Sequence, residues 1–303
     1  MAENVPLVSI VIPTFNRAGL LKSAIESCLR QTYGNVQIVV SDDGSTDGTD
    51  QMMNEYMSKF RSVVFAKNSK YRKGPNGNRN SGFDGAAGDF ICLIDDDDEL
   101  MPEAVAEMIN AHNKTGKRYM ISNCATADGK WTGFGLEGDC EITYLDAVCG
   151  RFYGDFFVMF HRDLLGEMRF DDRTYGGEYA LWGRLLRKEN GWYTAKPLQL
   201  KRYGDSGVTA GYYQHADGVL LAYEAILSDF GGDIKRHDPE RLTRLMSIAS
   251  LYAKLCGEHR KAFSYLLESL RFDKSAGRSY ATLLLLFMPA GLVKRLINIK
   301  TIY

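Results

Sequence analysis

Residues 89–98 read DFICLIDDDD, a short apolar run that ends in four successive aspartates. An apolar run of this length is typical of a strand buried in a parallel sheet. In open sheets of this kind, ligands bind at the edge where the carboxyl ends of the strands meet. The stretch therefore predicts a buried strand with a ligand site at its carboxyl end.

Strand and helix patterns alternate around this stretch. Near-continuous apolar runs predict buried strands at residues 7–13, 36–41, 62–66, 89–94 and 119–123. Apolar residues at the spacing of one helix face predict helices at residues 17–31, 47–60, 80–87 and 102–114. This alternation predicts a doubly wound α/β sheet with right-handed crossovers.

The pattern loosens after residue 129. We expect strands at 156–160 and 194–203 with a helix at 178–188 between them, and then helices at 219–230, 240–256 and 260–271. This change predicts a main domain over residues 1–210 and a helical region over residues 211–303.

Composition narrows the class of protein. A formal charge of −1 argues against a nucleic-acid partner, although residues 234–303 carry 13 Lys and Arg against 5 Asp and Glu. Six cysteines without a CxxC pair indicate reduced thiols, and the N-terminus lacks the pattern of a signal peptide. We therefore expect a cytoplasmic protein.

Residues 280–299 read YATLLLLFMPAGLVKRLINI, apolar early and basic late. A spanning helix needs about 20 apolar residues, and Pro289 and Lys294 interrupt this run too early. Two interpretations stay open: a helix at 280–300 that lies on an anionic membrane surface, or one that packs on the protein's own core.

The acidic run itself predicts a cation site. In an extended chain, Asp95 and Asp97 would point to one side and Asp96 and Asp98 to the other. Crowded carboxylates raise one another's pKa, and a hard divalent ion such as Mn²⁺ or Mg²⁺, bridging a diphosphate, relieves the repulsion. The alternative is a solvated acidic turn before the next helix.

Two further polar clusters follow predicted strands. Residues 41–49 read SDDGSTDGT, which is also what turns and helix N-caps use. An aspartate there can accept hydrogen bonds from a nucleobase or ribose. Residues 13–17 read PTFNR, with an aromatic ring able to stack on a base.

In this order and spacing, SIVIPTFNR, VVSDDGSTDGT and FICLIDDDDELMP closely resemble the family 2 inverting glycosyltransferases of the GT-A fold. Between them, GPNGNRNSG at 74–82 resembles that family's Gly/Asn/Arg loop before the metal strand. The resemblance covers roughly residues 8–203. It implies a mixed doubly wound sheet with a nucleotide-binding half at 1–125 and an acceptor half at 126–210.

The resemblance also implies roles for single residues. The metal, Mn²⁺ or Mg²⁺, is expected at Asp97 with Asp95 as a second ligand. Arg202, in a loop that resembles one closing over donor or acceptor, could meet a phosphate. The nucleotide-sugar donor is expected to contact Pro13, Thr14, Phe15, Arg17, Asp43, Asn76, Arg79, Asp95, Asp96 and Arg202.

The catalytic base is expected in a segment that the family writes roughly as GEDYELWxR. Residues 176–184 read GGEYALWGR, which puts Glu178 in place of the Asp and Gly177 in place of the Glu. Either carboxylate can take a hydroxyl proton within hydrogen-bond reach, so Glu178 is the predicted base. The alternative for Glu178 is a helix N-terminal residue that complements the dipole.

By resemblance, the chain would move a sugar from a nucleotide-diphosphate donor, a UDP-sugar, to a hydroxyl of a saccharide or polyprenyl-linked saccharide. A lipid-linked acceptor and the basic C-terminal third suggest that the protein acts at the inner face of the cell membrane, in polysaccharide assembly. One alternative is a nucleotidyltransferase, although PTFNRAG lacks the Gly-rich loop expected there. Another is a catalytically silent scaffold or carbohydrate-binding protein, which only the Gly177 departure favours.

Overall fold

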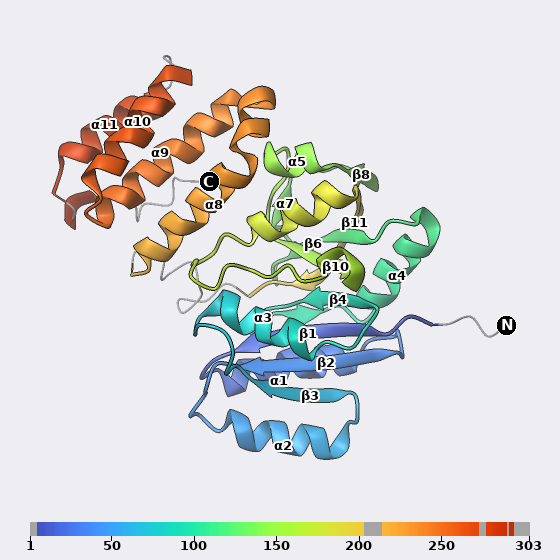
Figure 1. Ribbon diagram of the computed structural model, residues 1–303. Coiled ribbons are helices and arrows are strands. Elements are labelled where there is room, and N and C mark those ends of the chain that lie inside the picture. Colours follow the sequence, from blue (N-terminus) through green and yellow to red (C-terminus); the bar gives the residue numbers. More distant parts are fainter. Residues whose placement is uncertain (1–4, 203–213, 273–276, 290, 294–303) are drawn as a thin grey trace. The chain divides into compact units, whose positions relative to one another are not determined.

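The computed structural model describes residues 5–202, 214–272, 277–289 and 291–293 (Figure 1). The chain divides into two compact units. The first comprises Met1–Ala147, Arg151–Asp172 and Leu181–Gly204, and the second Val148–Gly150, Arg173–Ala180 and Asp205–Tyr303. The boundary expected after residue 210 lies outside the described residues.

The first unit contains a mixed sheet whose strand order is β3-β2-β1-β4-β10-β6-β11-β5, with β8 paired to β11. Strands β1 to β4 run parallel to one another, whereas β10 runs antiparallel to both of its neighbours, β4 and β6. The strands are β1 (Val8–Thr14), β2 (Val36–Asp42), β3 (Val63–Lys67), β4 (Phe90–Leu93), β5 (Glu99–Leu100), β6 (Tyr119–Ala125), β8 (Cys140–Ile142), β10 (Phe156–His161) and β11 (Gly191–Leu200). The predicted mixed, doubly wound sheet is confirmed.

Helices cover both faces of this sheet (Figure 1). They are α1 (Ala18–Leu29), α2 (Thr49–Lys59), α3 (Pro75–Gly85), α4 (Ala104–Thr115), α5 (Tyr144–Val148), α6 (Arg162–Leu165) and α7 (Tyr179–Lys188). Alternation along β1 sends Ile10 and Ile12 into a core with α1 and α4, and Val11 into a second core with α3 and α7. A separate ribbon pairs β7 (Gly133–Phe134) with β9 (Tyr153–Gly154).

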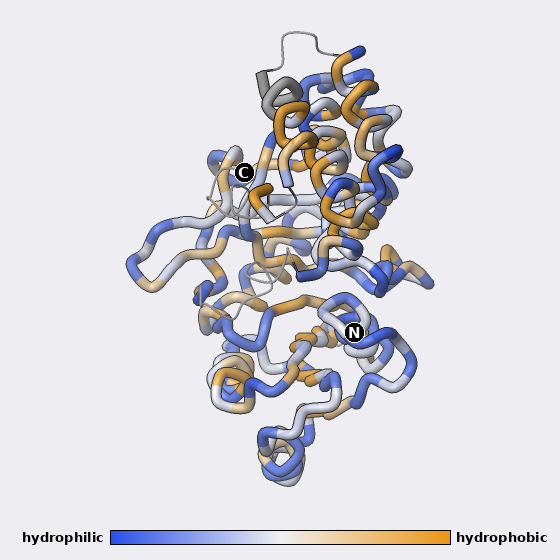
Figure 2. Tube along the Cα trace, turned by 90° about the vertical axis from the view of Figure 1, so that its left-hand side faces the viewer, coloured by the Kyte–Doolittle hydropathy of each residue, from blue (hydrophilic) through white to orange (hydrophobic). Residues whose placement is uncertain are grey.

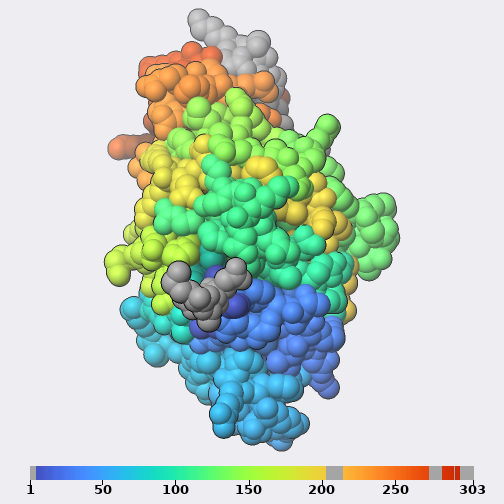
Figure 3. All heavy atoms as spheres, turned by 90° about the vertical axis from the view of Figure 1, so that its right-hand side faces the viewer, coloured from blue at the N-terminus to red at the C-terminus, as the bar shows by residue number. Residues whose placement is uncertain are grey.

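Helices α1 and α4 lie side by side on one face. The Gln31 side chain, just beyond α1, donates to the Met101 carbonyl and accepts from the Val105 backbone N–H in α4. Figure 3 shows this side of the unit, where the green surface of residues around α4 borders the blue surface of the N-terminal segments. The two hydrogen bonds of the Gln31 side chain thus fix the start of α4, the helix that follows the aspartate run.

One helix begins earlier than its sequence pattern predicts. Helix α3 starts at Pro75, whereas the sequence pattern predicted a helix from residue 80 and the family resemblance implied a loop at 74–82. Pro75 suits the first turn because its missing N–H would be unpaired there, and Gly74, at φ 136°, makes the sharp entry. Polar residues fill the buried face of this turn, so no apolar period marks it.

The second unit carries a group of helices. They are α8 (Ala216–His237), α9 (Pro239–Leu255), α10 (His259–Phe272) and α11 (Gly277–Phe287). Hydrophobic and hydrophilic residues alternate along them, as Figure 2 shows, and their apolar faces share a core built on Val219, Ala249 and Leu266. Within the described part of the chain, no helix has the length and hydrophobicity needed to span a bilayer.

A glycine limits what the first unit tolerates between α3 and β4. A Cβ at Gly88 would lie 2.6 Å from the Ser9 backbone nitrogen and 2.7 Å from two carbonyl oxygens. We expect Gly88→Ala to lower the free energy of unfolding by about 2 kcal/mol, because rigid backbone must move. Urea unfolding measures this, with Gly19→Ala in α1 as the control, since nothing lies within 4 Å of a Cβ there. Equal stability of the two variants would contradict the expectation.

Candidate active site

The carboxyl ends of three neighbouring strands meet at one edge of the sheet. Thr14 at the end of β1 pairs with Asp42 at the end of β2, and Val11 pairs with Leu93 at the end of β4. The Ile94 N–H continues this register by donating to the Val11 carbonyl at 3.1 Å. Parallel pairing therefore gathers the PTFN, SDDG and aspartate segments at one edge, as the sequence predicted.

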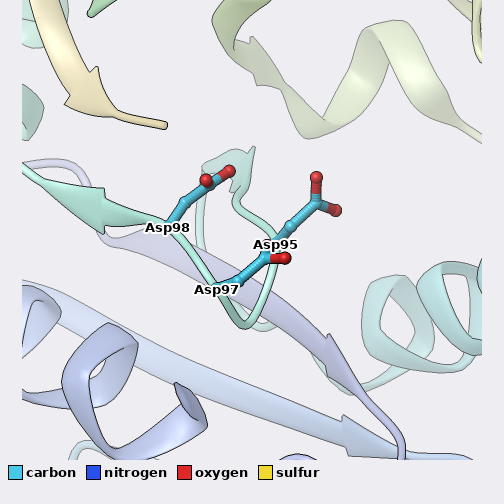
Figure 4. A group of neighbouring side chains, drawn as sticks. All are labelled: Asp95, Asp97 and Asp98. Carbon is cyan, nitrogen blue, oxygen red and sulfur yellow. The ribbon is translucent and has the colours of Figure 1, made fainter. Parts of the chain in front are cut away.

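The aspartate run forms a tight turn. The Asp98 N–H donates to the Asp95 carbonyl at 3.1 Å. As a result Asp95, Asp97 and Asp98 offer carboxylate oxygens that all lie within 4.8 Å of one another (Figure 4). The expected alternation of the four side chains is wrong, because a turn replaces the extended chain that it assumed. Asp96 instead accepts a hydrogen bond from the Thr14 hydroxyl at 2.7 Å.

Arg17 bridges two of the four carboxylates. One guanidinium nitrogen donates to Asp96 at 2.7 Å and the other to Asp97 at 2.6 Å. The Asp96 side chain is only 4% exposed, so this cation offsets a charge that water does not reach. Arg17, predicted to contact the donor, is therefore also the counter-ion of the turn.

Lys201 and Arg79 hold the other side of the turn. The Lys201 ammonium donates to Asp98 at 2.6 Å and to Asp95 at 3.3 Å. Arg79 donates to Asp95 at 3.0 Å and, through its other terminal nitrogen, to Asn76 at 3.2 Å. Helix α3 thus carries two predicted donor-binding residues to the aspartates. Lys201, directly after β11, supplies a cation that was not predicted.

These contacts set the protonation of the turn. Burial raises the pKa of Asp96 to about 7, against the opposing effects of Arg17 and the Thr14 hydroxyl. Burial likewise raises the pKa of Asp98 to about 6, although Lys201 acts against it. At Asp95 burial is outweighed by Lys201 and Arg79, which hold its pKa below the usual range. Of these three carboxylates, Asp95 is therefore the one most firmly held in its charged form.

Asp43 stands between the turn after β2 and the start of α3. Its two carboxylate oxygens accept from the Asn68 side chain at 2.7 Å and from the Gly74 N–H at 2.6 Å. An ionised carboxylate offers about four acceptor positions, so capacity for a base or ribose remains. Its neighbour Asp42 instead caps the turn by accepting from Ser45.

Phe15 lies at the same edge with 51% of its surface exposed. The next residue, Asn16, takes a left-handed conformation at φ 53°, and its side chain accepts from the Thr46 N–H at 2.7 Å. This link ties the PTFN turn to the SDDG turn. An exposed ring held on such a turn offers a stacking surface for a base.

Two polar side chains at the end of β11 escaped the prediction. Gln199 donates to Asp98 at 2.7 Å, as Lys201 also does. Arg202, predicted to meet a phosphate, donates its backbone N–H to Asp98 at 3.2 Å and its guanidinium to Glu99. The sequence did show polar residues at the end of a predicted strand. It did not show that this strand pairs with β6 and β5, which brings those residues to the aspartate turn.

The predicted base, Glu178, belongs to the second unit, whereas the aspartate turn belongs to the first. It directly precedes helix α7, which begins at Tyr179. Gly177 has φ 77°, and a Cβ there would lie 2.6 Å from the Ala222 Cβ of α8. A side chain at position 177 would meet the Ala222 methyl group of α8, which is consistent with glycine in place of the expected glutamate.

The donor set of the turn suits a hard divalent cation. Three carboxylates supply oxygen ligands, which Mg²⁺ and Mn²⁺ prefer, and one oxygen of each lies within 4.8 Å of the others. Asp95 and Asp97 were the predicted ligands, and the turn adds Asp98. When all four carboxylates are ionised, the three basic side chains leave one negative charge uncompensated.

Comparison with known proteins agrees with this geometry. The family model described as glycosyl transferase family 2 matches residues 9–165, and the chain belongs to this family. It is 31% identical over 305 residues to the GalNAc(5)-diNAcBac-PP-undecaprenol beta-1,3-glucosyltransferase of Campylobacter jejuni, covering 97% of this chain and 98% of that protein.

Two further proteins extend the comparison. The chain is 28% identical over 184 residues to the UDP-Glc:alpha-D-GlcNAc-diphosphoundecaprenol beta-1,3-glucosyltransferase WfgD of Escherichia coli, covering 61% of this chain and 71% of that protein. The fold of this chain is similar to that of S. aureus TarS 1-349 in complex with UDP-GlcNAc. The TM-score is 0.60 at 16% identity, covering 88% of this chain and 91% of that one.

Removal of Arg17 tests the charge balance of the turn. We expect Arg17→Ala to lower the free energy of unfolding at pH 8 by about 3 kcal/mol, because Asp96 loses its cation while buried. The loss should shrink at pH 6. Asp96 has a pKa raised from 3.8 to about 7, so below that pH it takes up a proton and needs no partner.

Urea unfolding at pH 6 and pH 8, with chelator present, measures both values. Arg30→Ala is the control, since its pairing with Glu99 at 3.6 Å is exposed and worth at most about 1 kcal/mol. A loss that is independent of pH would contradict the role of Arg17.

Proposed function

We propose that this chain is an inverting glycosyltransferase that moves a sugar from a UDP-sugar to a hydroxyl of a lipid-linked saccharide. The observation that carries the proposal is the turn in which Asp95, Asp97 and Asp98 converge at the carboxyl edge of the sheet. Membership of family 2 supports the reaction class. The two glucosyltransferases named above support the donor and acceptor, and make UDP-glucose the first donor to test.

The chain's own residues would bind and orient the donor. Phe15 would stack on the base, and Asp43 would accept hydrogen bonds from the base or ribose with its remaining lone pairs. Arg79, already held at Asp95, would face the diphosphate with a fixed positive charge. Asp43 and Arg79 are fixed by contacts of their own before the donor arrives, which reduces the ordering cost of binding.

Glu178 would take the proton from the acceptor hydroxyl as its oxygen attacks the anomeric carbon. A single displacement of this kind inverts the configuration at that carbon. Asp95, Asp97 and Asp98 would hold Mn²⁺ or Mg²⁺ beside the donor diphosphate. When bound, such a cation supplies positive charge that stabilises the departing nucleoside diphosphate.

The other readings of the chain receive less support. A nucleotidyltransferase would need a Gly-rich basic loop after β1, where Phe15 and Asn16 form a turn tied to the next loop instead. The silent scaffold rested on Gly177, and the packing of Ala222 gives that glycine a structural cause.

Two substitutions test the chemistry. We expect Glu178→Gln to fold normally and to lower UDP release from UDP-glucose by roughly 10²–10⁴-fold, because general-base catalysis is lost. We expect Asp97→Ala to fold and to lose the response of this rate to Mn²⁺. The assay is hydrolysis of UDP-glucose with and without Mn²⁺, in which water takes the place of the acceptor hydroxyl, glucose forms and UDP is released. A panel of other nucleotide sugars identifies the preferred donor. A Glu178→Gln enzyme with near-normal turnover would refute the base.

We also propose peripheral contact of the second unit with an anionic membrane, where a lipid-linked acceptor would lie. Apolar side chains are exposed on α10 and α11, with the Phe263 and Phe287 rings 6.0 Å apart between centroids. Leu267 and the exposed Arg260 and Arg271 share the outer face of α10. An apolar surface flanked by arginines suits a headgroup layer that carries negative charge. Of the segment expected at 280–300, residues 290 and 294–300 lie outside the described residues.

Flotation with vesicles tests this contact. We expect the full chain to float with vesicles that contain anionic phosphatidylglycerol and not with neutral phosphatidylcholine vesicles. Phe287→Ser should lower the floated fraction severalfold, because this side chain is 74% exposed. Phe60→Ser in the first unit is the matched control for loss of an exposed ring. Equal recovery on both vesicle types would rule out the contact.

A further inference from the structure

The segment Arg173–Ala180, which carries Glu178, is part of the second unit together with the C-terminal helices. Gly176 and Gly177 both take left-handed conformations, at φ 72° and 77°. Two successive left-handed residues set the direction in which the chain enters α7. The backbone immediately before Glu178 is therefore sharply bent, and whatever supports that bend sets the position of its carboxylate.

Helix α8 supplies the support through small residues on one face. Gly218 and Ala222 are four residues apart, so they lie on the same side of the helix. A Cβ at Gly218 would lie 2.9 Å from the Tyr175 backbone nitrogen, and one at Gly177 would lie 2.6 Å from the Ala222 Cβ. The bend thus rests directly on α8, with no room for a further methyl group.

Ring contacts hold both sides of the bend. The Tyr175 ring stacks on His215, just before α8, with centroids 4.2 Å apart and planes 16° apart. The Tyr179 ring lies 5.8 Å from the guanidinium carbon of Arg241 in α9. Tyr175 also packs against the helical core of the second unit. Glu178 is therefore bracketed by two aromatic residues that the C-terminal helices fix.

We propose that helix α8 positions Glu178 for proton transfer, with Gly177 and Ala222 as the positioning residues. This inference rests on the proposed role of Glu178 as the base. A displacement of about 1 Å in a catalytic group can cost about 10²-fold in rate. The C-terminal helices would thus contribute to the transfer step itself, through the backbone that carries the base.

The contact is tested from both of its sides. Gly177→Ala should lower the rate of UDP release from UDP-glucose by about 10²-fold, with the Kd for UDP unchanged. Ala222→Gly, added to Gly177→Ala, should restore at least tenfold, because it removes the methyl group that the new Cβ would meet. The rescue is partial because an alanine at φ 77° remains strained. Wild-type turnover of Gly177→Ala overturns the proposal, as does a double variant with no recovery.

The Glu178→Gln background separates positioning from general damage. If Gly177 acts through the base, Gly177→Ala should lower the residual rate of Glu178→Gln no further. A further fall of about 10²-fold would show that Gly177 acts elsewhere, and would overturn the inference while leaving the base intact. Full activity of Glu178→Gln would overturn the base itself, and with it the proposed role of α8.

Further variants keep the result interpretable. Gly232→Ala lies on the same helix with nothing within 4 Å of the new Cβ, so its turnover should equal that of the wild type. Ala222→Val enlarges the contact from the other side without straining residue 177, and it should lower turnover in the same way. If Gly177→Ala fails to fold, as judged by its melting curve, Ala222→Val decides: unchanged turnover overturns the proposal.

Discussion

Four carboxylates in one turn repel one another, and three basic side chains at the sheet edge offset that repulsion. Arg17 bridges Asp96 and Asp97, and Lys201 and Arg79 hold the remaining side of the turn. The three cations come from segments that are far apart in the sequence. Their ion pairs therefore tie the start of α1, the helix α3 and the end of β11 to the loop that follows β4. The ion pairs that neutralise the aspartates therefore also bring the segments of the site together.

This arrangement keeps the turn ready for a cation and a diphosphate. Burial alone would protonate Asp96 and Asp98, whose pKa values stand at about 7 and about 6 even beside their cations. Asp95 stays charged because two cations face it. When all four carboxylates are ionised, one negative charge is left over, which a divalent ion can balance. The same basic groups then lie where a diphosphate would bring its own negative charge.

Within the second unit, the constraint is steric. The family pattern predicted a carboxylate at position 177, and the chain has glycine where α8 packs against that backbone. A departure that at first suggested lost activity is therefore matched by Ala222, a small residue about 45 positions later in the sequence. The residue types at positions 177 and 222 are consistent with their contact, and neither is explained by its local sequence.

Sequence alone determined the parallel strands, the edge at which their polar ends meet, and the carboxylates placed there. These follow from local apolar runs and from parallel pairing, which brings strand ends together wherever such runs succeed one another. Only the tertiary structure decided that the aspartates turn and that α3 begins at Pro75. It also decided that Lys201, just after β11 and about 100 residues away in the sequence, neutralises Asp98. Those outcomes depend on strand order and burial, which no local pattern records.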